Sequence, residues 1–132
     1  MIFIDSNIPM YLVGGSPKHQ ADAQVLVDRS FAAHERIVTN VEVFQEILHR
    51  YISIQRREAI DDAFRVLLGI VDSVLPLDEV DVMRARDIVQ TAPLSARDAL
   101  HIAVMQRHGI RRILSFDADF DRWPGIERVW QV

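Results

Sequence analysis

Four acidic residues, far apart in the sequence, occupy positions from which a folded chain could bring their side chains together. Two follow short apolar runs and two lie near the starts of segments with helical patterning; they are Asp5, Glu46, Asp98 and Asp117. Carboxylates packed together without partners repel one another and raise one another's pKa, so a divalent cation is their natural compensation. Oxygen ligands of this kind suit Mg²⁺ or Mn²⁺.

The chemistry that such a site favours is metal-dependent hydrolysis of phosphodiesters. Cations held by carboxylates activate a water molecule for attack and stabilise the negative charge that develops on the phosphate, either singly or as a pair of ions. The sequence therefore predicts hydrolysis by metal-activated water, without a covalent intermediate.

Three of the four acids also have a structural interpretation. Asp5 could be an N-cap acid or a turn residue. Asp98 falls in the first turn of its predicted helix, where it would favour the helix dipole, and Glu46 could pair with Arg50 one turn later. Glu42 is predicted to be the acid of a capping box that starts at Thr39, which makes Glu46 the better candidate for the site.

The run Asp117-Ala-Asp119-Phe-Asp121 resembles the start of a calcium-binding EF-hand loop. That loop needs glycine at the position of Arg122 and glutamate at the position of Arg128, so calcium is excluded. Asp117 is therefore kept as the acid that ends the strand, with Asp119 as the second choice.

Other catalytic chemistries lack their residues. Ser115 has no glycine-rich elbow around it, and no G-x-G-x-x-G or Walker A motif is present. A receiver-like phosphoacceptor domain built on Asp5 would need a lysine beside the acidic pocket, and the only lysine, Lys18, lies in a loop or at a helix start. His101, one turn beyond Asp98, could line the site, although a lone histidine on a helix is more often a packed or solvated residue.

Short apolar runs alternate with segments of helical periodicity along the chain. Strands are expected at 1–4, 37–38, 71–77, 113–116 and 129–132. Helices are expected up to Val13, from His19 to His34, from Thr39 past Tyr51, from about Gln55, from Asp78 to about Gln90 and from Ser95 to Gly109, with a short turn or helix from Asp117. For the third helix, Thr39 is the predicted N-cap, and Val38 and Val43 stand where a hydrophobic staple would place them.

This alternation predicts an α/β fold with a mostly parallel sheet. In such a sheet the carboxyl ends of the strands and the starts of the following helices share one edge, so the four acids are expected to converge there. The sequence contains no internal repeat or linker, and its 132 residues are expected to form a single domain spanning 1–132.

Composition excludes several classes of protein. The absence of cysteine excludes a disulfide scaffold, a cysteine-based zinc site and a thiol nucleophile. The apolar runs are far shorter than a membrane span and nothing resembles a signal peptide, so we expect a cytoplasmic protein without a membrane partner. The net charge of -4 is the opposite of that of an autonomous nucleic-acid binder, but cations bound by the four acids would reverse the local field where phosphate must bind.

Four segments resemble, in order, the motifs of PIN-domain ribonucleases. They are Met1-Ile-Phe-Ile-Asp5-Ser-Asn7, Thr39-Asn40 followed by Glu46-Ile-Leu, Arg97-Asp98-Ala-Leu-His-Ile-Ala103, and Ser115-Phe-Asp117-Ala-Asp119-Phe120. In these motifs and in length the chain is similar to VapC-type toxins of bacterial and archaeal toxin-antitoxin pairs. The resemblance covers essentially the whole chain, and it depends on the order and spacing of the motifs more than on any single one.

The resemblance implies an acidic quartet of Asp5, Glu46, Asp98 and Asp117. It implies that Asp5 and Asp98 foremost, with Asp117, bind Mg²⁺ or Mn²⁺, and that Asn7 and Ser115 are polar residues beside the site. Asp119 remains the alternative to Asp117.

The resemblance also implies a three-layer α/β/α fold around a five-stranded sheet, a homodimer, and a VapB-like antitoxin whose tail reaches into the acidic site. On this basis we expect a Mg²⁺-dependent endoribonuclease acting on RNA. The alternative from another class is a catalytically inactive PIN-like module whose acids bind a basic partner peptide.

Overall fold

The computed structural model describes residues 1–132 and contains a five-stranded sheet flanked by helices. The strands are β1 (Ile2–Ile4), β2 (Ile37–Asn40), β3 (Ser73–Leu75), β4 (Arg112–Leu114) and β5 (Glu127–Val129). The helices are α1 (Asn7–Gly14), α2 (Pro17–Ala32), α3 (Val41–Ser53), α4 (Ile60–Ile70), α5 (Glu79–Thr91) and α6 (Ala96–Arg107), with 3₁₀ helices η1 (Arg57–Ala59) and η2 (Ala118–Arg122).

All strand pairs are parallel, and the strand order is β3-β2-β1-β4-β5. The central strand β1 is buried along its whole length, because it has helices on both faces and a neighbouring strand on each side. In the register of the sheet, Phe3 lies opposite Val38 of β2 and Ile113 of β4. The carboxyl ends of these three strands therefore meet at one edge.

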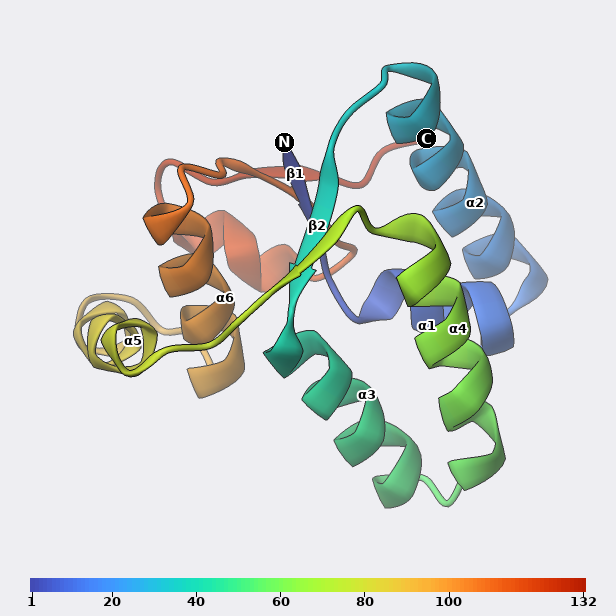
Figure 1. The fold of residues 1–132 in the computed structure, drawn as a ribbon, viewed down its shortest axis with the longest axis horizontal. Coiled ribbons are helices and arrows are strands. Elements are labelled where there is room, and N and C mark those ends of the chain that lie inside the picture. The colour runs from blue at the N-terminus through green and yellow to red at the C-terminus, as the bar shows by residue number, and fades with distance from the viewer.

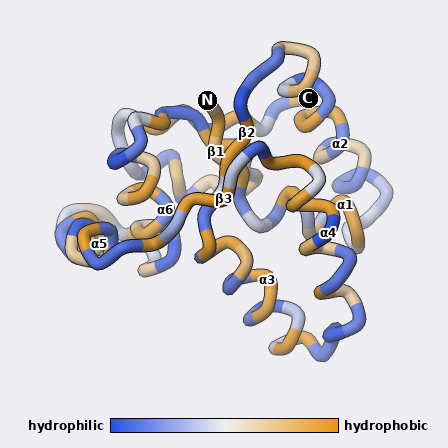
Figure 2. Tube along the Cα trace, in the orientation of Figure 1, coloured by the Kyte–Doolittle hydropathy of each residue, from blue (hydrophilic) through white to orange (hydrophobic).

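Helices cover both faces of the sheet, which confirms the predicted three-layer α/β/α arrangement. Figure 1 shows α1, α2 and α4 on one side of the strands and α5 and α6 on the other, while α3 runs outward from the carboxyl end of β2 beside α4. The tube along β1 is hydrophobic in Figure 2, and Phe3, Ile47, Ile102 and Phe120 are completely buried in the core that joins the layers.

The start of α3 differs from the prediction. Asn40, not Thr39, is the N-cap: its side-chain Oδ1 accepts a hydrogen bond of 3.1 Å from the backbone N–H of Val43. Thr39 is still part of β2, and its hydroxyl donates a 3.0 Å hydrogen bond to the carbonyl of Ile4 in β1. The Thr39 hydroxyl is therefore bonded to the neighbouring strand and does not cap the helix. The predicted capping box of Thr39 and Glu42 is wrong.

The last strand also differs from the prediction. It spans Glu127–Val129 instead of 129–132, because its partner β4 ends at Leu114, which lies opposite Val129. Trp130 lies beyond the last paired residue and is partly exposed. Polar residues such as Glu127 are accommodated because β5 is an edge strand.

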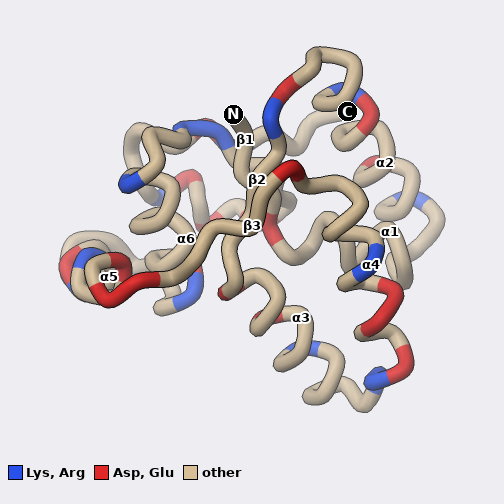
Figure 3. The backbone as a smooth tube through the Cα atoms, in the orientation of Figure 1, with Lys and Arg blue, Asp and Glu red and all other residues tan.

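Charged residues lie mainly on the outer surfaces of the helices. Figure 3 shows acidic and basic residues interspersed along α5, where Arg86 and Asp87 form an exposed ion pair. This agrees with a solvated helix face. No helix combines the length and the apolar character that crossing a bilayer requires.

Candidate active site

Asp5 stands at the carboxyl end of the central strand, and its backbone N–H donates to the carbonyl of Leu114 in β4. The Asp5 residue is 3% exposed. Ser115 Oγ donates a 2.6 Å hydrogen bond to Asp5 Oδ2, and Asn7 Nδ2 donates to the same oxygen at 3.0 Å. Asn7 Oδ1 in turn accepts from the backbone N–H of Phe116 at 3.2 Å. Asn7 and Ser115 therefore hold the Asp5 carboxylate in one orientation, which fits their predicted place beside the site.

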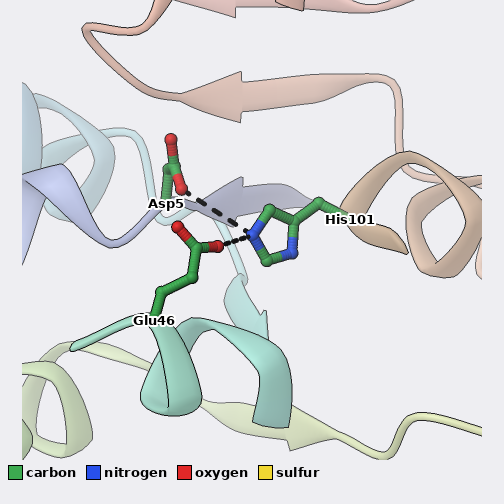
Figure 4. Close-up of side chains that lie close together, drawn as sticks. All are labelled: Asp5, Glu46 and His101. Atoms are coloured by element: carbon green, nitrogen blue, oxygen red, sulfur yellow. Dashed lines mark hydrogen bonds and ion pairs between the residues drawn. The ribbon is translucent and has the colours of Figure 1, made fainter. Parts of the chain in front are cut away.

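Glu46 reaches the same edge from the second turn of α3, and it meets His101 of α6 there. Figure 4 shows the Glu46 carboxylate and the Asp5 carboxylate on the same side of the His101 ring. His101 Nε2 is hydrogen-bonded to Glu46 Oε1 and lies 3.9 Å from Asp5 Oδ1. Glu46 Oε2 accepts a 3.2 Å hydrogen bond from Ser6 Oγ. The alternative pairing of Glu46 with Arg50 does not form, and the ion-pair partner of Glu46 is His101.

Asn40 determines how the buried imidazole of His101 is protonated. Because Asn40 Oδ1 accepts from Val43, its amide NH₂ faces His101 Nδ1, at 3.1 Å. Nδ1 must then accept a hydrogen bond, so in the neutral ring the proton lies on Nε2 and points at Glu46. The residue that caps α3 thus also orients the acid–imidazole pair.

Asp98 lies in the first turn of α6, whose N-cap is Ser95, as predicted: Ser95 Oγ accepts a 3.1 Å hydrogen bond from the Asp98 backbone N–H. The Asp98 residue is only 7% exposed. Oxygen atoms of Asp98, Asp117 and Asp119 all lie within 4.8 Å of one another. Unlike the carboxylates of Asp5 and Glu46, that of Asp98 receives no hydrogen bond or ion pair from the protein.

Asp117 follows β4 and caps the 3₁₀ helix η2, with its Oδ1 accepting a 2.9 Å hydrogen bond from the backbone N–H of Asp119. Asp119 lies 3.3 Å from a guanidinium nitrogen of Arg122, and its side chain is 44% exposed. Arg122 therefore offsets the charge of Asp119, whereas no cation of the protein pairs with Asp117. This difference favours Asp117 over Asp119 as a ligand.

The electrostatics couple the four acids into one cluster. Burial and the negative charges of Asp117 and Asp5 raise the pKa of Asp98 to about 7. Burial also raises the pKa of Asp5, and this effect exceeds the lowering by the nearby His101; the negative charge of Glu46 adds a smaller upward contribution. Since a carboxyl group normally titrates near 4, ionising this cluster at neutral pH costs free energy that a bound cation would recover.

Two further residues at the site are not among those that the sequence assigns to it. The sequence indicates only that His101 could line the site, because nothing in it shows that α6 turns this side chain toward Glu46. Glu42, assigned to the cap, instead lies 3.9 Å from Arg97, and burial raises its pKa. The signal available for His101 was its position three residues after Asp98, on the same face of the helix.

The donor set fits a divalent cation that prefers oxygen ligands. Asp98 offers a buried carboxylate without a protein partner, Asp117 lies within reach of it, and Asp5 contributes an adjacent charge. Cysteine is absent, and the single histidine of the cluster is already engaged through both ring nitrogens. Hard cations such as Mg²⁺ and Mn²⁺ match these ligands better than zinc does.

Comparison with known proteins gives a consistent result. A family model described as the PIN domain matches residues 2–126. The chain is 56% identical over 130 residues to "Ribonuclease VapC13" of Mycobacterium tuberculosis, covering 98% of this chain and 99% of that protein.

Two solved structures share the fold. The sarcin-ricin loop cleaving toxin VapC20 of Mycobacterium tuberculosis aligns with a TM-score of 0.74 at 22% identity, covering 92% of this chain and 93% of that one. VapBC2 from Rickettsia felis, solved bound to a DNA fragment from its promoter, aligns with a TM-score of 0.73 at 13% identity and covers 98% of both chains. The match over nearly the whole chain, together with the acidic edge of the sheet, shows that this chain belongs to the PIN-domain family of VapC ribonucleases.

Proposed function

We propose that the chain is a Mg²⁺-dependent endoribonuclease that hydrolyses phosphodiester bonds of RNA, and that residues 1–132 form one catalytic domain. The observation that carries the proposal is the Asp98 carboxylate, which is buried beside Asp117 and Asp5 and has no donor from the protein. High identity to a protein named as a ribonuclease supports the class of reaction.

Asp5, Asp98 and Asp117 would hold the cation, Mg²⁺ or alternatively Mn²⁺. When bound, the cation lowers the pKa of water and stabilises the negative charge that develops on the phosphate. Asn7 and Ser115 prepare Asp5 for this role by fixing its Oδ2 with two hydrogen bonds. The Ser115 hydroxyl donates its proton to the hydrogen bond with Asp5, which would hold the cation, and it has no other neighbouring base to activate it as a nucleophile. This supports direct attack by water over a covalent serine intermediate.

Glu46 would take the proton of the attacking water at Oε2. Its other oxygen faces the imidazole of His101, and Oε2 accepts only the 3.2 Å hydrogen bond from Ser6 Oγ. His101 is a positioning residue: it keeps the Glu46 carboxylate aimed at the space beside Asp5, and Asn40 keeps His101 in place.

A VapB-like antitoxin is the partner that this site favours in a toxin-antitoxin pair. A basic side chain entering the cluster would form charge-assisted hydrogen bonds with the acids and compete with the cation. We also propose a homodimer in the cytoplasm, and exposed apolar side chains of α5 such as Val82 and Met83 offer surface for such contacts. Co-purification with the products of the flanking reading frames, followed by mass determination of the complex, tests both assignments.

Cleavage of labelled RNA by the purified chain tests the enzymatic proposal. Mg²⁺ should support cleavage and excess EDTA should abolish it, while Asp98→Asn and Glu46→Gln should each lose most of the activity. Asp87→Asn is the matched control, because it removes a carboxylate from the exposed face of α5 and leaves the site intact. An inactive module that binds a basic peptide would show no cleavage with any cation and would bind its partner equally well in EDTA.

A further inference from the structure

A pocket of about 630 Å³ lies beside the acidic cluster and is not used by the proposed chemistry. It is formed by residues of α1, the first turns of α2, the residue after Ser115, and the chain beyond β5: Tyr11, Lys18, His19, Asp22, Phe116, Trp130, Gln131 and Val132. We call it the aromatic pocket. Four of these residues carry an aromatic ring, which is far above their share of the chain.

The aromatic pocket shares its framework with the site. Phe116 stands between Ser115 and Asp117 in the sequence, and its backbone N–H donates to Asn7, which itself holds Asp5. Tyr11 lies one turn after Asn7 on α1. The aromatic pocket and the acidic cluster therefore meet at the segment from Ser115 to Asp117 and at the start of α1.

The rings are held in place by contacts with other side chains. Tyr11 stacks on His19 with centroids 4.5 Å apart and an interplanar angle of 9°, and it also packs against Phe116 at 5.4 Å. The guanidinium of Arg128 lies 4.7 Å from the ring centroid of Trp130, whose residue is still 42% exposed. The pocket thus presents preformed flat surfaces, and part of the indole is open to a ligand.

Polar groups at the rim complement these surfaces. Lys18 and Asp22 form an exposed ion pair at 2.7 Å, and Gln131 adds an amide. Single-stranded RNA is typically bound by aromatic side chains that stack on unpaired bases and by polar groups that contact base edges and phosphates. A purely apolar peptide side chain would leave the ion pair and the amide without a role.

We propose that the aromatic pocket binds an unpaired nucleobase of the RNA, next to the phosphodiester bond cleaved at the acids. This inference rests on the proposed ribonuclease function. The pocket would select single-stranded over duplex RNA, because a base stacked within a helix cannot enter it.

Fluorescence of Trp130 tests the binding step without cleavage. The chain has two tryptophans, so Trp123→Phe leaves Trp130 as the only indole. In Mg²⁺, with Glu46→Gln added to block cleavage, a short single-stranded RNA should quench this fluorescence to saturation, while the same sequence in duplex form should not. Absence of quenching by both forms would overturn the proposal.

Substitutions locate the effect in the pocket. Since stacking on one aromatic side chain contributes about 1–3 kcal/mol per base, Phe116→Leu should weaken binding by about 5- to 150-fold. Trp130→Leu, in a residue outside every helix and strand, should act likewise when binding is followed by anisotropy of a labelled RNA. Phe31→Leu is the matched control, because it removes an exposed ring of α2 that does not line the pocket, and it should leave the dissociation constant unchanged.

Cleavage kinetics distinguish failure of this inference from failure of the proposed function. If the wild type cleaves RNA and Phe116→Leu and Trp130→Leu raise KM while Phe31→Leu does not, both stand. If the wild type cleaves RNA and all three variants have its KM and dissociation constant, the pocket proposal is overturned and the ribonuclease stands. If quenching is observed without any cleavage in Mg²⁺, the ribonuclease proposal fails and the base-binding pocket remains.

Discussion

Replacing Asp98 by asparagine should stabilise the cation-free protein while it removes activity. The Asp98 carboxyl has a pKa of about 7 in the folded protein against 3.8 without its surroundings. Below about pH 4 the carboxyl is protonated in both the folded and the unfolded protein, so it does not affect the free energy of unfolding. As the pH rises from about 4 to about 7, only the unfolded protein ionises this carboxyl readily, so the folded protein loses stability. Asparagine keeps the shape of the neutral acid and avoids this loss.

The size of the effect follows from the pKa values. One pKa unit corresponds to about 1.4 kcal/mol, so ionising Asp98 in the folded, cation-free protein costs about 4 kcal/mol at most. Solvent at the open side of the cluster lowers this ionisation cost. We therefore expect Asp98→Asn to stabilise the protein by about 2–4 kcal/mol at about pH 8. At about pH 4 the difference should vanish, because both side chains are then neutral in the folded state.

Urea unfolding in EDTA at both pH values measures this difference directly. Asp87→Asn should change the free energy of unfolding by less than about 0.5 kcal/mol at either pH, since it removes only an exposed ion pair. Adding Mg²⁺ should stabilise the wild type, because the cation binds only the folded state. Asp98→Asn should stay nearly unchanged, because it lacks the carboxylate that binds the cation. A variant that is less stable than the wild type at the higher pH in EDTA would refute the electrostatic reasoning.

Three other substitutions test the framework around the site. Arg107→Met should destabilise the protein by about 3–5 kcal/mol in thermal or urea unfolding, because it leaves the buried carboxylate of Asp81 without its two 2.8 Å hydrogen bonds. Hydrogen bonds from Arg107 and from the backbone of Asp78 outweigh burial and lower the pKa of Asp81. The stability that this pair contributes is therefore present above about pH 4 and falls as the pH drops below it. Asn40→Ala should cost about 1–2 kcal/mol through loss of the α3 cap, measured by unfolding, and should also lower cleavage because His101 loses its orienting partner. Phe120→Ala, at a completely buried position, should cost about 3–5 kcal/mol in the same assay.

The sequence predicted the acidic edge because its signals are local. Asp5 ends a run of apolar residues, Asp117 follows another, and the cap at Ser95 places Asp98 in a first turn. Parallel connectivity then brings strand ends to one edge without further information. The order of elements was correct for the same reason.

The parts that sequence could not provide depend on contacts between distant segments. Thr39 and Asn40 are both good N-caps, and only the hydrogen bond from Thr39 to Ile4 across the sheet decides between them. The role of His101 depends on how α6 packs against α3, which brings its ring to Glu46. The end of β5 is determined by the length of β4.

The choice between Asp117 and Asp119 was left open by the sequence for a related reason. Both residues follow β4 within the same short turn, and they differ through the side chain of Arg122, which lies beside Asp119. Side-chain pairing of this kind depends on the turn that η2 makes, and the spacing of acids alone does not reveal it.

The central claim is that Asp5, Asp98 and Asp117 hold the divalent cation on which RNA cleavage depends. A crystal soaked in Mn²⁺ at a concentration that supports cleavage, with the anomalous signal recorded, tests it most directly. We predict an anomalous peak in contact with Asp98 and with carboxylate oxygens of Asp5 or Asp117, and no such peak in Asp98→Asn. A wild-type cluster without a peak, or a peak held only by other residues, would contradict the claim.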